Sequence, residues 1–248
     1  MKIVMFARCL ALLLSLMALP TWAQDARGIT AYQEIIDVAP GGSATVTLNV
    51  TLADSGLDRI DLPLNFAKPE NFAVDAKDLK ATAAAGKTGD VKVIKLQFDR
   101  KPAGEVKVQI TFTAKEFFNW EKAKGAHGVY NLSYTFANAT ATDINGYALK
   151  VLLPTGYDIA GITSSTPKAT GEEAEPPYDF RTQSGRTALN LRSKSVAPGK
   201  GAAIAFGFEK DERNPLLVIA LGIIIAALAL YLKRDVLTDP DFVKETVA

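Results

Sequence analysis

Eighteen consecutive uncharged residues, Pro215–Leu232, constrain this chain more than any other feature of its sequence. As an α-helix at about 1.5 Å per residue, the stretch is about 27 Å long, close to the roughly 30 Å hydrocarbon core of a membrane. Lys233 and Arg234 follow it directly, and Tyr231 stands where an interfacial aromatic side chain is expected. The stretch predicts one transmembrane helix. The alternative is a helix buried in the core of a domain.

The first 23 residues have the three parts of a secretory signal peptide. Lys2 and Arg8 provide a positive start, residues 9–19 are apolar, and Ala23 is a small residue at the expected cleavage position. We therefore expect the mature chain to begin directly after Ala23, with an uncleaved N-terminal anchor as the alternative.

The two signals agree on one topology. Export of the N-terminus leaves residues 24–214 outside and the tail of residues 233–248 in the cytoplasm, as the positive-inside rule prefers for Lys233 and Arg234. The predicted location is the plasma (inner) membrane, crossed once, with a periplasmic or extracytoplasmic N-terminal domain.

The external region has a balanced charge and needs a hydrophobic core. Residues 24–214 hold 23 basic and 23 acidic residues, so they present no net positive charge to nucleic acid, which is not an expected partner. The only cysteine of the chain, Cys9, lies in the signal segment. Without disulfides, an exported domain must be stabilised by apolar packing.

Alternation of apolar and polar residues predicts β-strands throughout this region. The clearest example is Ala44–Leu52, in which valine and leucine alternate with threonine and asparagine. Similar patterns cover residues 106–112 and 130–136, whereas residues 81–90 are rich in Ala, Thr and Gly and are expected to form a loop. The spacing of strands and turns favours antiparallel β-sandwiches.

The predicted fold is mainly β, with two immunoglobulin-like antiparallel β-sandwiches followed by one transmembrane α-helix. The first sandwich covers residues 24–116, and a connector of residues 117–128 leads to the second, residues 129–212. The helix, residues 215–232, comes directly after the second sandwich.

The second half also carries two segments with a familiar pattern. Leu-Lys-Val-Leu-Leu-Pro-Thr-Gly-Tyr at 149–157 resembles the apolar strand and Leu-Pro-x-Gly segment of bacterial immunoglobulin-like domains of cell-surface and periplasmic proteins. Val-Ala-Pro-Gly at 196–199, before a strand, is similar to the end of those domains. The resemblance covers residues 129–209. It implies a sandwich used for spacing, adhesion or partner binding, with no catalytic residues to transfer.

Residues that could carry chemistry are sparse. His127 is the only histidine, and no Gly-x-Ser-x-Gly segment accompanies it, so a Ser-His-Asp triad is not expected. One histidine and no mature cysteine exclude ordinary zinc sites. Asp54, Asp58 and Asp61 crowd one turn and could bind calcium, but solvated turn carboxylates are the simpler explanation. We expect no catalytic, cofactor-binding or metal-binding residues.

Two groups of residues are candidates for partner binding. Phe117, Phe118 and Trp120 form the densest aromatic group outside the signal, and they either wedge the two sandwiches together or form an exposed anchor. Gly222 and Ala226 are four residues apart in the apolar stretch, a spacing that allows a second helix to approach closely.

These observations predict a non-enzymatic accessory or scaffold subunit of a membrane or envelope assembly. The expected partners are the lipid bilayer and one or more membrane proteins. The alternative is a module that binds glycan or cell-wall polymer through loops such as residues 164–179, and a hydrolase is the third possibility.

Overall fold

The structure is a computed structural model that describes residues 28–53, 56–168, 175–211 and 215–232. Within the last range, only the side chains of residues 220–229 and 231 are described. The chain divides into two compact units, residues 1–210 and 211–248, and each is considered by itself. The predicted signal segment and cytoplasmic tail lie outside the described residues.

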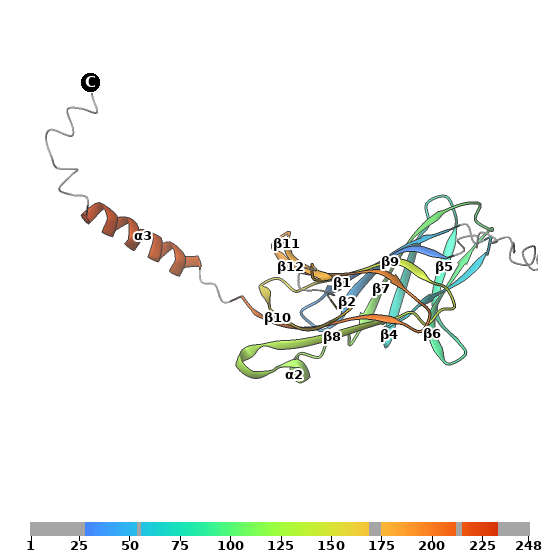
Figure 1. The fold of residues 1–248 in the computed structure, drawn as a ribbon, viewed down its shortest axis with the longest axis horizontal. Helices are drawn as coiled ribbons and strands as arrows, with labels where there is room; N and C mark the ends of the chain where they lie inside the picture. Colours follow the sequence, from blue (N-terminus) through green and yellow to red (C-terminus); the bar gives the residue numbers. More distant parts are fainter. Residues whose placement is uncertain (1–27, 54–55, 169–174, 212–214, 233–248) are drawn as a thin grey trace, which may run out of the picture. The chain divides into compact units, whose positions relative to one another are not determined.

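The first unit is built from three β-sheets (Figure 1). The largest has seven strands in the order β11-β12-β9-β1-β2-β7-β4, and two smaller ones have the orders β10-β13-β8 and β3-β6-β5. The strands are β1 (Ile29–Val38), β2 (Ala44–Leu52), β3 (Arg59–Pro63), β4 (Lys68–Asp75), β5 (Ala81–Thr88), β6 (Val91–Phe98), β7 (Val106–Lys115), β8 (Tyr130–Ala137), β9 (Ile144–Leu152), β10 (Tyr157–Thr166), β11 (Tyr178–Gln183), β12 (Arg186–Val196) and β13 (Gly201–Lys210).

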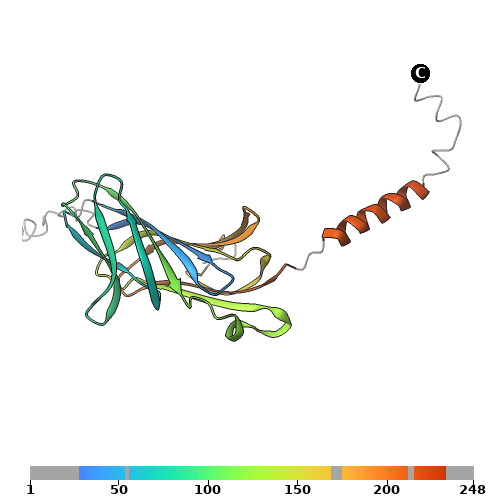
Figure 2. The ribbon, with the colours of Figure 1, turned by 180° about the vertical axis from the view of Figure 1, so that it is seen from behind.

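A single hydrophobic core joins the three sheets. Alternate side chains of the central strands face it, as in β2, where Val46, Leu48 and Val50 are buried and Thr47 and Asn49 between them are not. Phe136 of β8 stacks on Tyr147 of β9 with 4.2 Å between ring centroids, so the seven-stranded sheet and the β10-β13-β8 sheet meet through aromatic packing. Figure 2 shows β5 and β6 at the opposite end of this unit from β11 and β12.

The fold differs from the two separate sandwiches expected from the sequence. β1, from the predicted first sandwich, pairs in parallel with β9, from the predicted second, in a register that aligns Tyr32 with Tyr147. Both halves therefore contribute to one sheet and one core, and residues 117–128 do not separate two compact units. The mainly β class is confirmed. Alternation fixes which face of a strand is buried, but it carries no information about which strand lies beside it.

Residues 81–88 form a strand where a loop was expected. Every residue of β5 pairs with β6, from Ala81 opposite Phe98 to Thr88 opposite Val91. β5 is made of small residues and has little apolar alternation, because only a few of its side chains reach the core. The backbone of β5 pairs with β6, which has more buried apolar residues. The strand therefore depends on its neighbour more than on its own β-propensity.

The second unit contains helix α3 (Pro215–Leu232), whose bounds match the predicted apolar helix. Large apolar side chains in its described part are exposed, including Leu221, Ile224 and Leu228 at more than half of their surface. Among the described side chains, no helical stretch is long and apolar enough to cross a membrane. The membrane span remains a prediction.

Candidate functional site

The predicted aromatic group lies where β7 leads into the short helix α2 (Trp120–Ala123). Asn119 caps this helix, because its side-chain oxygen accepts a hydrogen bond of 3.0 Å from the Lys122 backbone N–H. Phe118 is buried, and Phe117 and Trp120 are half-buried against the core. The three aromatic residues predicted from the sequence therefore do cluster in space, but much of their surface packs against other residues of the chain.

Trp120 is the centre of this cluster. Its ring makes edge-on contacts with Phe118, Tyr130 and Phe208 at centroid distances of 4.9, 5.0 and 5.7 Å. Tyr157 of β10 packs against the same indole at 5.2 Å. The buried indole N–H has no acceptor among the described residues, so packing alone holds the ring.

An open pocket of about 760 Å³ lies beside this cluster. Phe118 and Trp120 contribute its aromatic surface, and the remaining lining residues are polar, charged or glycine: Gly41, Ser43, Lys115, Glu116, Asn119, Glu121 and Lys122. The pocket therefore combines an apolar surface with charges of both signs at its rim.

The wall of the pocket depends on a close backbone approach. Gly42 has a φ of +82°, and its carbonyl oxygen accepts a hydrogen bond of 2.8 Å from the Phe118 N–H. A β-carbon at this position would lie 2.1 Å from the Phe118 carbonyl oxygen. Only glycine fits here, because any side chain would meet backbone atoms that cannot move aside.

Two ion pairs hold the charged rim. The ammonium group of Lys68 donates to Glu116 at 2.6 Å, and Lys115 lies 2.7 Å from Glu70. The hydrogen bond from Lys68, with its positive charge, lowers the pKa of the Glu116 carboxyl. Glu116 therefore carries its negative charge at neutral pH, although it is exposed and its pairing is screened by water.

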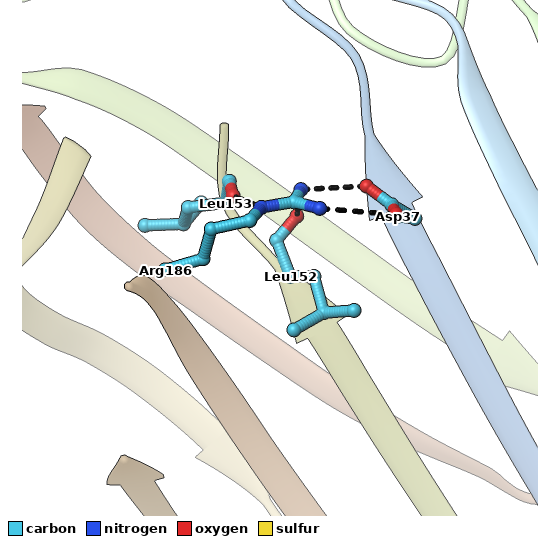
Figure 3. Close-up of polar contacts among 4 residues, drawn as sticks. All are labelled: Asp37, Leu152, Leu153 and Arg186. Carbon is cyan, nitrogen blue, oxygen red and sulfur yellow. Dashed lines mark hydrogen bonds and ion pairs between the residues drawn. The ribbon is translucent and has the colours of Figure 1, made fainter. Parts of the chain in front are cut away.

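A second cluster of polar groups holds the β11–β12 hairpin (Figure 3). Arg186, the first residue of β12, donates to both carboxylate oxygens of Asp37 on β1, at 2.6 and 3.1 Å. Its Nε also donates to the carbonyl oxygen of Leu153 at 2.7 Å. Arg186 thus reaches across β9 and ties the edge of the sheet to its centre.

An open pocket of about 390 Å³ lies beside this hairpin. Asp179 of β11 accepts a hydrogen bond of 2.5 Å from Asn190, and it pairs with Arg181 at 3.0 Å and Arg192 at 3.9 Å. Both arginine side chains are 72 % exposed. The region therefore presents charged groups on a sheet edge.

A buried carboxyl group lies in the core, and sequence reasoning missed it. Glu34 of β1 is 1 % exposed and accepts a hydrogen bond of 3.0 Å from the Tyr147 hydroxyl. Burial raises its pKa from 4.5 to about 7, and Tyr134 and Tyr147 act in the opposite direction. The Tyr134 hydroxyl lowers the pKa of Glu34 although it makes no hydrogen bond of regular geometry with any described residue. The alternation of β1 could have predicted this burial, because Glu34 stands between the inward-facing Tyr32 and Ile36.

The other candidates remain apart from these clusters. His127 lies in the 3-10 helix η1 (Ala126–Gly128) with a φ of +57° and is exposed. Within the described residues, no group of three or more His, Cys, Asp or Glu side chains could hold a metal. Gly222 and Ala226 lie on α3 in the second unit, and their role as a helix-contact surface stays a prediction.

Comparisons with known proteins find likeness only among solved structures. No protein-family model matches the sequence, and no curated protein matches it. The M1 zinc metallopeptidase from Deinococcus radiodurans is similar over 73 % of this chain and 42 % of its own, with 14 % identity and a TM-score of 0.39. Leukotriene A4 hydrolase from Saccharomyces cerevisiae is similar over 76 % of this chain and 31 % of its own, with 8 % identity and a TM-score of 0.40.

These names contradict two predictions made from the sequence. The sequence predicted a non-enzymatic scaffold subunit without enzymatic activity, whereas the solved structures named above are hydrolases, so neither assignment is kept. The chain spans less than half the length of those enzymes. At this low similarity, no activity is transferred from them to this chain. The resemblance to bacterial immunoglobulin-like domains is not tested by these comparisons.

Proposed function

We propose that this chain is an exported, membrane-tethered domain that binds a polypeptide at the pocket beside Trp120. The first 23 residues would direct export, and α3 would cross the plasma membrane once with residues 233–248 in the cytoplasm. A helix with apolar residues on all sides requires an apolar environment, which supports the span.

The observation that carries the proposal is the pairing of aromatic surface with a rim of both charges. Aromatic side chains dominate the binding energy of protein interfaces, and surrounding polar groups fix orientation. Phe118 and Trp120 supply the aromatic surface, and Lys115, Glu116 and Lys122 supply the charged groups around it. A polypeptide with an apolar side chain flanked by charged ones fits this arrangement.

The packing of Trp120 supports a preformed site. Its ring is fixed by several aromatic neighbours, so little side-chain freedom is lost when a ligand binds. The capped helix α2 places Lys122 at the pocket in the same way.

Photocrosslinking of the full chain in cells tests this proposal. A benzoylphenylalanine at Lys122, which is exposed and lines the pocket, should attach to a polypeptide that mass spectrometry of the adduct identifies. The matched control is the same group at Lys87, an exposed residue of β5 at the other end of the unit. The Lys122 adduct should fall at least tenfold when Trp120→Ala is added. Equal adducts at both positions, or none at Lys122, would reject the pocket as a binding site.

A further inference from the structure

The edge strand β11 offers backbone groups to another strand. It is the last strand of the seven-stranded sheet, and no described strand pairs with its outer side. Its six residues pair with β12 without a register shift. The opposite edge, β4, contains Pro69 and a bulge between Glu70 and Ala73, features that prevent regular pairing. β11 has neither.

The hydrogen bonds inside the hairpin show which residues face outward. The Arg192 N–H of β12 donates to the Pro177 carbonyl oxygen at 2.8 Å, so Pro177 and Arg192 form a hydrogen-bonded pair of the ladder. Bonded and non-bonded pairs alternate along an antiparallel ladder. Tyr178, Phe180 and Thr182 therefore direct their backbone N–H and C=O groups away from β12, toward the open edge.

The side chains of β11 are self-complementary in one register. In a two-fold antiparallel pairing centred on Phe180, Asp179 of each copy lies opposite Arg181 of the other. Tyr178 lies opposite Thr182 in the same register. A centre at Asp179 or at Arg181 would instead place two like charges opposite each other, which is unfavourable.

The backbone is compatible with this register. Pairing centred on Phe180 makes outward-facing residues meet each other, so their N–H and C=O groups form reciprocal hydrogen bonds. Asp179 and Arg181 then fall at the closer, non-hydrogen-bonded positions, where opposite charges interact most directly. Their existing ion pair of 3.0 Å within one copy becomes part of an alternating set of four charges.

Phe180 supplies the apolar contact. It is 57 % exposed although it lies opposite the buried Leu189, on the side of the sheet that faces the core. At the centre of the two-fold pairing, it would lie beside Phe180 of the second copy. Cross-strand aromatic pairs stabilise sheets, and exposed aromatic residues on an edge invite such pairing.

We propose that two copies of this chain associate through antiparallel pairing of their β11 strands, centred on Phe180, to form one continuous sheet. The surface is isologous: each copy contributes the same residues, and each charge meets its opposite. The proposal is independent of the Trp120 pocket, which belongs to α2 and the end of β7.

Cysteine crosslinking of the full chain tests the register directly. In a chain carrying Cys9→Ser, Phe180→Cys places two thiols at positions with Cα atoms about 5.5 Å apart, within disulfide range. Thr182→Cys is the matched control, because this residue is exposed on the same edge. In the proposed register the Cα atoms of its two copies are about 14 Å apart. Under mild oxidation, only Phe180→Cys should form a disulfide-linked dimer on a non-reducing gel.

Charge variants give a second readout. Arg181→Asp should reduce the Phe180→Cys dimer at least fivefold, because two acidic residues then face two acidic residues. When the Arg181→Asp chain is mixed with an Asp179→Arg chain, both carrying Phe180→Cys, crosslinking between the two variants should be restored. Crosslinking of both cysteine variants, of neither, or of Phe180→Cys only to a different protein would overturn the proposed self-association. So would an unchanged dimer yield in Arg181→Asp.

Discussion

Arg186 and Asp37 are 149 positions apart in the sequence and form a two-point ion pair, with 2.6 Å between Nη2 and Oδ1 and 3.1 Å between Nη1 and Oδ2. The side chain of Arg186 is 23 % exposed and that of Asp37 is 43 % exposed. The planar guanidinium group matches the two oxygens in a way that lysine cannot. This contact holds the β11–β12 hairpin, and therefore the proposed dimer edge, against the centre of the sheet.

Removing this contact should destabilise the unit. Arg186→Ala removes the ion pair and the hydrogen bond to the Leu153 carbonyl, so we expect a loss of about 1–3 kcal/mol in the free energy of unfolding. Urea denaturation of the full chain measures this loss. Arg192→Ala is the control, because Arg192 is 72 % exposed and its ion pair is 3.9 Å long. It should cost less than about 0.5 kcal/mol. Equal losses would mean that the Asp37 contact is not the stabilising feature.

The stability of the first unit should fall as pH rises. Burial raises the folded-state pKa of Glu34 to about 7, above its ordinary 4.5. The folded state therefore binds a proton at Glu34 more readily than the unfolded state does. The resulting contribution to the free energy of unfolding is fully present below about pH 4.5 and is lost as pH rises through 7. Tyr32, Tyr134 and Tyr147 face the carboxyl and remain protonated, because burial raises the pKa of each hydroxyl. The change attributable to Glu34 is roughly 3 kcal/mol.

Glu34→Gln should remove most of this pH dependence. The amide keeps the shape of the side chain and an acceptor for Tyr147 but carries no charge at any pH. The measurement is the urea midpoint of both proteins between pH 5 and pH 8. If both proteins show the same slope against pH, Glu34 is not the group that titrates.

The two neighbouring glycines of the β1–β2 turn should respond differently to alanine. Gly42→Ala forces a side chain into a φ of +82° and against the Phe118 carbonyl oxygen, so we expect a loss of about 1–3 kcal/mol and a distorted Trp120 pocket. Gly41→Ala meets no atom within 4 Å and should be close to neutral. Thermal unfolding and tryptophan fluorescence of both variants provide the test. An undisturbed Gly42→Ala protein would contradict the close approach.

The α3 surface can be tested in the same comparative way. Beyond the backbone of α3 itself, a β-carbon on Gly222 would meet no described atom of its own unit within 4 Å, so Gly222→Leu with Ala226→Leu adds bulk without a clash there. We expect the double variant to reach the membrane at its normal level but to lose any neighbouring helix that depends on this face. Native gel electrophoresis of detergent extracts measures the loss as a lower mass. An unchanged mass would show that this face makes no helix contact.

The sequence by itself determined the mainly β class, most strands and the bounds of α3. Alternation in Ala44–Leu52 and the uncharged run Pro215–Leu232 are local patterns, and local patterns suffice when one face or a whole segment must avoid water. The aromatic cluster at Phe118 and Trp120 was also visible, because aromatic density is a property of the sequence alone.

Only the tertiary structure decided which strands are neighbours. The parallel pairing of β1 with β9, the strand character of Ala81–Thr88, and the meeting of Arg186 with Asp37 all join segments whose own residues do not specify a partner. The same is true of Glu34, whose raised pKa depends on tyrosines from other strands. A strand's alternation selects the face it buries, whereas its partner is selected by how all the apolar faces close around one core.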